Sequence, residues 1–184
     1  MGETAQQRQG KEKKMFQVAV AVIGVVIASV CDMRMRKIPN WLTFTMIAAG
    51  FVLNSVENGS LGFQNSLFGF TLGVVLLYLP FTLGGVGGGD VKLLGGLGSL
   101  LGYSLIFKIF LASAVLGGIF SLYFAVQKKR TNEIFSDLRS KALLFYLTRK
   151  IVPEDPTASS NKLYIPYAYA ISLGTLIVIF VLRG

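Results

Sequence analysis

Residues 15–31 read MFQVAVAVIGVVIASVC, an apolar stretch that no charged side chain interrupts. A helix needs about 17–20 such residues to cross the hydrocarbon core of a bilayer. The stretch is uniform and has no small-residue cleavage site, so we interpret it as a retained helix and not as a signal peptide. It predicts an integral membrane protein.

Further apolar runs predict five more spans, at residues 41–56, 63–83, 91–103, 105–127 and 163–182. The breaks between the first five spans carry residues that end or interrupt helices: Pro39, the turn ENGS at 57–60, the stretch GGVGGGD at 84–90 and Gly102-Tyr103-Ser104. We expect the glycine-rich stretch to be too flexible for a regular helix. The predicted fold is all-α, a polytopic membrane helical bundle of about six transmembrane helices.

The chain length favours a single membrane domain, residues 15–184, preceded by a polar, mobile, basic N-terminal tail at residues 1–14. Residues 128–162 form the longest predicted loop, on the cytoplasmic side. Within this loop, apolar and basic residues recur at helical spacing between Ile134 and Lys150. The spacing suits an amphipathic helix on the membrane surface, and equally a solvated helix of no special role.

The composition restricts the chemistry. The chain has no histidine, which excludes His-based triads and zinc-protease motifs. Its single cysteine, Cys31, allows no intrachain disulfide and no cysteine-cluster zinc site, so we assign it to packing. The groups left for catalysis are carboxylates, lysines, hydroxyls or a bound metal.

The formal net charge is +9, but we expect no nucleic-acid partner because aromatic and basic residues do not interleave. With six spans, the loops after the first, third and fifth spans share one side. They hold Arg34, Arg36, Lys37, Lys92 and the basic residues of 128–162. The positive-inside rule therefore makes this side cytoplasmic, which puts the chain in the cytoplasmic membrane and its basic tail on the opposite side, against the same rule.

Between Met15 and Gln127 the only acids are Asp32, Glu57 and Asp90. We read Glu57 as a solvated turn residue. Asp32 ends the first span and Asp90 begins the fourth, so parity places both at the cytoplasmic edge. Ionisable residues at membrane depth are costly and usually functional. Taken singly, Asp90 could be an N-cap and Asp32 could pair with Arg34 or Arg36.

Two carboxyl groups within hydrogen-bond reach cannot both ionise easily, so they share one proton. The ionised group can then take a proton from water while the neutral group polarises a scissile carbonyl, as in aspartic proteases. This chemistry needs neither histidine nor metal, and we expect no cofactor. Residues 87–89, all glycine, would let a substrate backbone approach Asp90, although close helix packing would also use them.

The residues around both aspartates resemble a known family. Residues 87–90, GGGD, match the G-x-G-D signature of membrane aspartyl proteases, and GGGDVKLLGGLG at 87–98 resembles the second aspartate motif of type IV prepilin peptidases and archaeal preflagellin peptidases. Asp32-Met33-Arg34 followed by Ile38-Pro39-Asn40 resembles the first motif of that family. IPYAYAI at 165–171 resembles its proline-containing last helix.

The resemblance implies a leader peptidase that cleaves basic leaders from prepilin-like or preflagellin-like membrane proteins on the cytoplasmic side. It assigns catalysis to Asp32 and Asp90, and support to the motif residues Gly87, Gly89, Lys92, Arg34, Pro39 and Asn40. Lys92 would orient the site or balance its charge, or would only snorkel to the interface.

The chain departs from the longer members of that family in two places. Its first loop is short and has no cysteine pair, so we expect the peptidase-only form without N-methyltransferase activity. Tyr167 and Tyr169 stand where a smaller or glycine-rich pattern is expected.

Three alternatives remain open at the level of sequence. A presenilin or signal-peptide-peptidase relative also uses G-x-G-D, but with another first motif and more spans. A proton- or ion-coupled small transporter would use the same acids and predicts ion-dependent uptake without cleavage. A non-catalytic assembly factor for a pilus or secretion machine predicts that neither aspartate matters.

Overall fold

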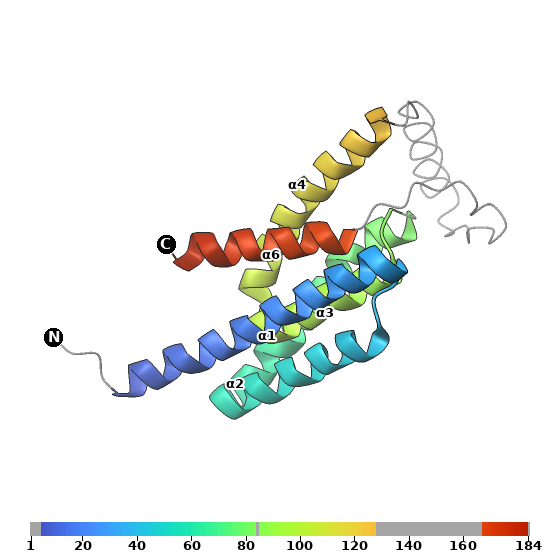
Figure 1. Cartoon of the computed structure of the whole chain (residues 1–184). Helices are drawn as coiled ribbons and strands as arrows, with labels where there is room; N and C mark the ends of the chain where they lie inside the picture. Colours follow the sequence, from blue (N-terminus) through green and yellow to red (C-terminus); the bar gives the residue numbers. More distant parts are fainter. Residues whose placement is uncertain (1–4, 84, 128–166, 184) are drawn as a thin grey trace.

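The computed structural model describes residues 5–83, 85–127 and 167–183, and within these ranges the chain is helical with no β-strand (Figure 1). The helices are α1 (Ala5–Met35), α2 (Asn40–Thr82), α3 (Gly88–Leu101), α4 (Tyr103–Gln127) and α6 (Tyr167–Arg183). The predicted all-α membrane bundle is confirmed. The predicted loop at 128–162, with its amphipathic helix, lies outside the described residues.

Helix α2 is a helical hairpin. Its backbone is non-helical at Gly59 (φ 58°, ψ −133°), a left-handed conformation that glycine adopts without steric cost. The halves 40–58 and 60–82 then pack side by side, and the rings of Phe51 and Phe63 lie 5.3 Å apart between centroids. The turn predicted at 57–60 is therefore confirmed, but only one of its residues, Gly59, has a non-helical backbone.

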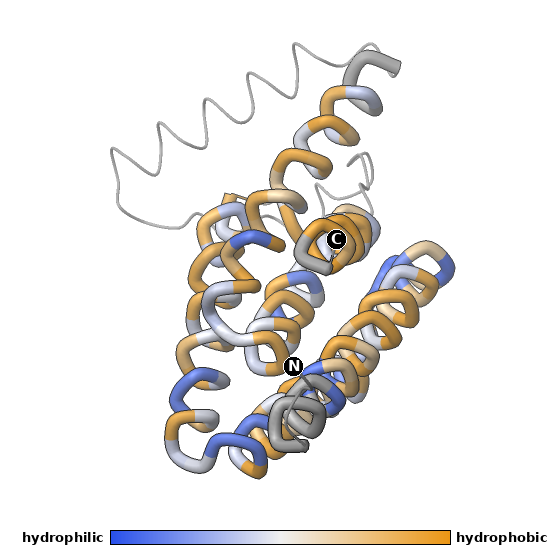
Figure 2. The backbone as a smooth tube through the Cα atoms, turned by 90° about the vertical axis from the view of Figure 1, so that its left-hand side faces the viewer, coloured by the Kyte–Doolittle hydropathy of each residue, from blue (hydrophilic) through white to orange (hydrophobic). Residues whose placement is uncertain are grey.

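Helices α1, α2 and α4 are long and apolar enough to cross a membrane, over Lys14–Met35, Asn40–Thr82 and Tyr103–Tyr123, and α6 carries a shorter apolar run. Hydrophobic residues cover most of the length of these helices (Figure 2). Large apolar side chains such as Phe44, Val75 and Ile119 point outward, as expected for helices that face lipid. The number of six crossings stays a prediction.

Helix α3 lies buried against both halves of α2, and glycines make the approach possible. A Cβ atom on Gly69 would collide with the carbonyl oxygen of Gly98, and one on Gly98 with the carbonyl oxygen of Gly69. A Cβ on Gly73 would come within 2.6 Å of the Leu94 carbonyl oxygen. Small residues at helix interfaces allow such backbone contact within membranes.

A polar network adds hydrogen bonds across the same interface and between the two halves of α2. Asn54 donates through Nδ2 to the carbonyl oxygens of Ser99 (2.9 Å) and Leu100 (3.2 Å). Ser66 donates to the carbonyl oxygens of Gly50 (3.1 Å) and Ser99 (2.9 Å). These side chains are buried, so the bonds satisfy polar groups that water cannot reach.

Several helices begin or end at residues other than those predicted. Helix α1 begins at Ala5 and not at residue 15, because the Ala-, Gln- and Lys-containing start of the tail favours a helix even without apolar residues. It continues to Met35, so Asp32 lies inside its last turns. The glycine-rich stretch 84–90 was predicted to be non-helical, yet α3 begins at Gly88. The break at Gly102 (φ 80°) is confirmed.

Replacement of Gly98 by alanine should destabilise the fold by about 1–3 kcal/mol, because the new methyl group meets a backbone carbonyl that cannot turn away. The matched control is Gly118→Ala, whose Cβ would have no neighbour within 4 Å. Thermal unfolding in detergent, followed by circular dichroism, should show a lower midpoint for Gly98→Ala only. Equal midpoints for the two variants would contradict the described packing.

Candidate functional site

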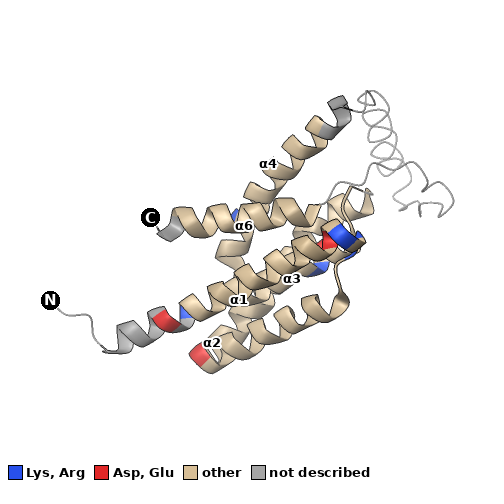
Figure 3. Cartoon of the chain, in the orientation of Figure 1, with Lys and Arg blue, Asp and Glu red and all other residues tan. Residues whose placement is uncertain are grey.

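Asp32 and Asp90 lie at the same end of the bundle. Asp32 occupies the last turns of α1 and is 4% exposed, and Asp90 occupies the first turn of α3 and is 7% exposed. The two carboxyl groups interact electrostatically. Figure 3 shows acidic and basic residues together at this end of α1. The predicted juxtaposition of two acids that are remote in sequence is therefore present.

The Asp90 carboxyl uses its two oxygens differently. Oδ2 accepts a hydrogen bond from the Gly87 backbone N–H (3.0 Å), while the Asp90 N–H donates to the Gly87 carbonyl oxygen (3.1 Å). Asp90 thus stands at the third helical position and Gly87 is the N-cap, so Asp90 is not the N-cap itself. Its carboxyl nevertheless takes part in capping, because it is the acidic member of a capping box at the start of α3. Oδ1 is buried and has no hydrogen-bond partner within the described residues.

The glycines beside Asp90 bring the two motifs into contact. A Cβ atom on Gly89 would lie 3.1 Å from the Ile38 Cβ, and one on Gly87 would lie 3.2 Å from the Asp90 Oδ2. The segment that leads from α1 to α2 therefore packs directly on the first turn of α3. We expected a substrate backbone to approach these glycines closely. In this structure the side chain of Ile38 occupies the space next to Gly89.

A second contact joins the motifs through Lys92. Its Nζ donates to the Oδ1 atom of Asn40 (3.0 Å) and lies 5.8 Å from the centroid of the Phe44 ring. Pro39 directly precedes α2 with an extended backbone and fixes the position of Asn40. Arg34 is exposed in the last turn of α1. Apart from Arg34, whose side chain points to the surface, the predicted supporting residues lie where the two motifs meet.

Tyr167 is the residue that the sequence did not assign to the site. It is the first residue of α6, is half-buried, and interacts electrostatically with Asp90. The sequence signal for Tyr167 is its position directly after Pro166, at the start of the last predicted span and at the edge that parity predicts to be cytoplasmic. In the sequence, Tyr167 stands out only as a departure from the family pattern.

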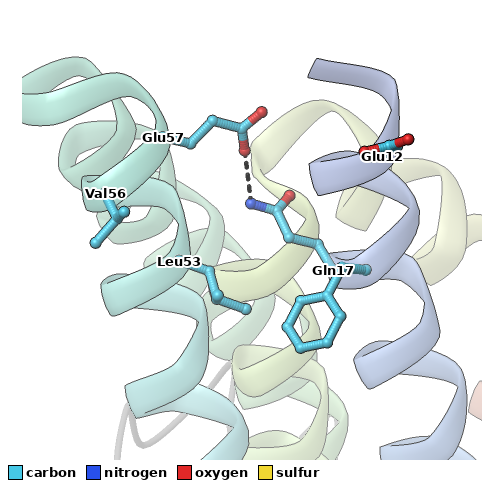
Figure 4. A pocket seen from close by; sticks show the side chains of 6 residues that line it. Glu12, Gln17, Leu53, Val56 and Glu57 are labelled. Atoms are coloured by element: carbon cyan, nitrogen blue, oxygen red, sulfur yellow. Dashed lines mark hydrogen bonds between the residues drawn. The ribbon is translucent and has the colours of Figure 1, made fainter. Parts of the chain in front are cut away.

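A cavity of about 300 Å³ lies at the other end of the bundle, between α1 and the bend of α2 (Figure 4). Its lining residues are Glu12, Phe16, Gln17, Leu53, Val56 and Glu57. Gln17 donates to the Glu57 Oε2 atom (2.9 Å), so Glu57 is held in a contact and is not the fully solvated turn residue that was expected. In the part of the chain that the structure describes, no three Cys, Asp or Glu side chains gather as metal ligands.

The fold and the site define a helical membrane protein that buries two interacting carboxyl groups at one end of its bundle. Residues 19–122, more than half of the chain, match the sequence model of the type IV leader peptidase family. The chain belongs to this family.

The matches to the archaeal relatives cover a smaller part of the chain than the family model does. The chain is 33% identical over 91 residues to a preflagellin peptidase of Methanococcus voltae and 35% identical over 91 residues to one of Methanocaldococcus jannaschii. These matches cover 47% of this chain and 39% and 38% of the relatives. A prepilin leader peptidase/N-methyltransferase of Bacillus subtilis is 28% identical over 116 residues, 61% of this chain and 46% of the relative. The matches thus span less than half of each relative, and no solved structure matches the chain significantly.

Cysteine cross-linking tests the juxtaposition of the aspartates. In a Cys31→Ser background, Asp32→Cys with Asp90→Cys should be joined by a short bifunctional thiol reagent, because both positions lie at one end of the bundle. The pair Asp32→Cys with Glu57→Cys is the control, since Glu57 lines the cavity at the opposite end.

Trypsin reports the result, because Arg34, Arg36 and Lys37 lie between the two positions of either pair. After digestion, fragments of the first pair should stay joined on a denaturing gel and fragments of the control pair should separate. Separation in both pairs would contradict the described site.

Proposed function

We propose that this chain is an aspartyl endopeptidase that removes the leader from prepilin-like or preflagellin-like membrane proteins. The observation that carries the proposal is the burial of Asp32 and Asp90 together at the junction of the two motifs. Membership of the type IV leader peptidase family supports the peptidase over the ion-coupled transporter and the assembly factor. The names of the archaeal and bacterial relatives suggest the substrate class.

The proposed reaction needs one ionised and one protonated carboxyl group. The ionised carboxylate removes a proton from a water molecule, whose oxygen attacks the carbonyl carbon of the scissile peptide bond. The protonated carboxyl donates to the carbonyl oxygen, giving a tetrahedral intermediate. That intermediate collapses with cleavage of the C–N bond, and a proton passes from a carboxyl to the leaving amine. Repulsion between two buried carboxylates favours the singly protonated pair that starts this cycle.

The surroundings of the site suggest how the substrate lies. Arg34, Arg36, Lys37 and Lys92 belong to the same end of the bundle as the aspartates, which by the positive-inside rule is the cytoplasmic end. The apolar helix of a precursor would remain in lipid, and its leader would meet the cytoplasmic surface. Because both aspartates are less than a tenth exposed, a peptide reaches them only after local opening of the bundle.

We assign only the peptidase activity to this chain. The Bacillus subtilis relative also carries an N-methyltransferase in its name. Here α1 and α2 are joined by residues 36–39 alone, a connection without cysteine and too short to form a further domain.

The test is co-expression with a prepilin-like precursor. Asp32→Asn and Asp90→Asn should each lower leader cleavage by about 10³-fold or more, because each removes a group that acts in the chemical step. Glu57→Gln should cleave normally, since Glu57 lies at the opposite end. Cleavage is followed by the size shift of the precursor, at matched amounts of membrane-inserted enzyme. Normal processing by either Asn variant would rule out the proposed mechanism.

A further inference from the structure

The register between α1 and α6 brings the start of α6 to the level of the aspartates. Ser172 donates to the carbonyl oxygen of Val25 (2.8 Å), and Ser29 donates to that of Ala168 (3.3 Å). Lower numbers on α6 thus face higher numbers on α1, so the helices are antiparallel (Figure 1). Continued by one residue, this register places Tyr167 beside the turn of α1 that leads to Asp32.

Packing fixes the ring of Tyr167. A Cβ atom on Gly117 of α4 would lie 2.5 Å from the Tyr167 Cε2, so the ring occupies the space that the glycine leaves open. The ring also packs against the hydrophobic core cluster. A side chain held in this way loses little further freedom when its hydroxyl forms a hydrogen bond.

The Asp90 carboxyl has an oxygen that needs a donor. Oδ2 is held by the Gly87 N–H, whereas Oδ1 is buried without a hydrogen-bond partner in the described ranges. A buried polar atom without a hydrogen-bond partner destabilises the fold, so a donor brought within reach of Oδ1 is strongly favoured. Tyr167 is a hydroxyl donor whose phenol lies within electrostatic range of the Asp90 carboxyl.

We infer that Tyr167 is a positioning residue for Asp90. Once a substrate is bound, the Tyr167 hydroxyl donates a hydrogen bond to Oδ1 while the Gly87 N–H holds Oδ2. The plane of the carboxyl is then fixed from both sides. Each carboxylate oxygen can accept a second hydrogen bond, so the attacking water or the scissile carbonyl still has access. The inference rests on the proposed peptidase function and adds the residue that orients one of its acids.

The chain supplies a matched control in Tyr169. This residue is 40% exposed, and its ring lies 5.8 Å from that of Phe120, measured between centroids. Phe120 lies about one turn along α4 from Gly117, so both tyrosines contact α4, but Tyr169 is exposed whereas Tyr167 is half-buried. The same Tyr-to-Phe change can therefore be made at a half-buried and at an exposed position of one helix.

The experiment measures kcat and KM for leader cleavage by the full chain in lipid vesicles, with a prepilin-like precursor as substrate. Tyr167→Phe should lower kcat by about 10- to 100-fold, the range known for residues that orient metal ligands, because Tyr167 would orient Asp90 by the same kind of hydrogen bond. KM should stay within about twofold, because the ring and its packing remain. Tyr169→Phe should match the wild type in both constants.

A second pair of variants tests the position of the Tyr167 hydroxyl without removing the hydroxyl. Gly117→Ala inserts a methyl group against the Tyr167 ring and should also lower kcat, whereas Gly118→Ala, which has open space, should not. This pair decides the question if Tyr167→Phe fails to fold.

The outcomes separate the inference from the function on which it rests. Wild-type kcat in Tyr167→Phe, with cleavage still abolished in Asp90→Asn, would overturn the positioning role and leave the peptidase intact. Normal cleavage by Asp90→Asn would overturn both. A rise in KM with unchanged kcat would also overturn the inference, because it would place Tyr167 in substrate binding.

Discussion

The backbone contact between α2 and α3 is the constraint on which the rest of the structure depends. Gly69 and Gly98 approach so closely that neither position has room for a methyl group, and the hydrogen bonds of Asn54 and Ser66 join the same helices. In lipid the hydrophobic effect does not drive helices together, so close packing and buried hydrogen bonds must do so. This contact fixes the position of α3, and with it the level at which Asp90 lies.

The site carries a cost that the packing has to offset. Two carboxyl groups buried in an apolar bundle are unfavourable in themselves, and one oxygen of Asp90 lacks a hydrogen-bond partner among the described residues. The Gly87 N–H compensates the other oxygen, and the contacts Gly89–Ile38 and Lys92–Asn40 hold the two motifs together. Buried polar atoms without a hydrogen-bond partner are rare in folded proteins, and a catalytic role is one of the reasons for which they occur.

Much of the fold could be predicted from the sequence, because membrane helices leave a strong and local signal. Apolar runs of sufficient length marked α1, both halves of α2, and α4, and glycines marked the reversals at Gly59 and Gly102. The errors lie at helix ends. Ala5 begins a helix and Gly88 begins another, because intrinsic propensity and the Asp90 carboxylate outweigh polarity and glycine content.

By itself, the sequence determined that this is an all-helical membrane protein and that Asp32 and Asp90 belong to one end of it. Successive spans cross the bilayer in alternating directions, so the number of spans between Asp32 and Asp90 is enough to place both residues on the same side. Tertiary structure decided how the acids are surrounded. Oδ2 of Asp90 accepts the Gly87 N–H at the start of α3, Ile38 packs on Gly89, and Tyr167 of α6 lies within electrostatic range of Asp90. Such contacts depend on the rotation of each helix about its axis, which small residues such as Gly98 and Gly117 set by permitting close approach and which no local sequence pattern encodes.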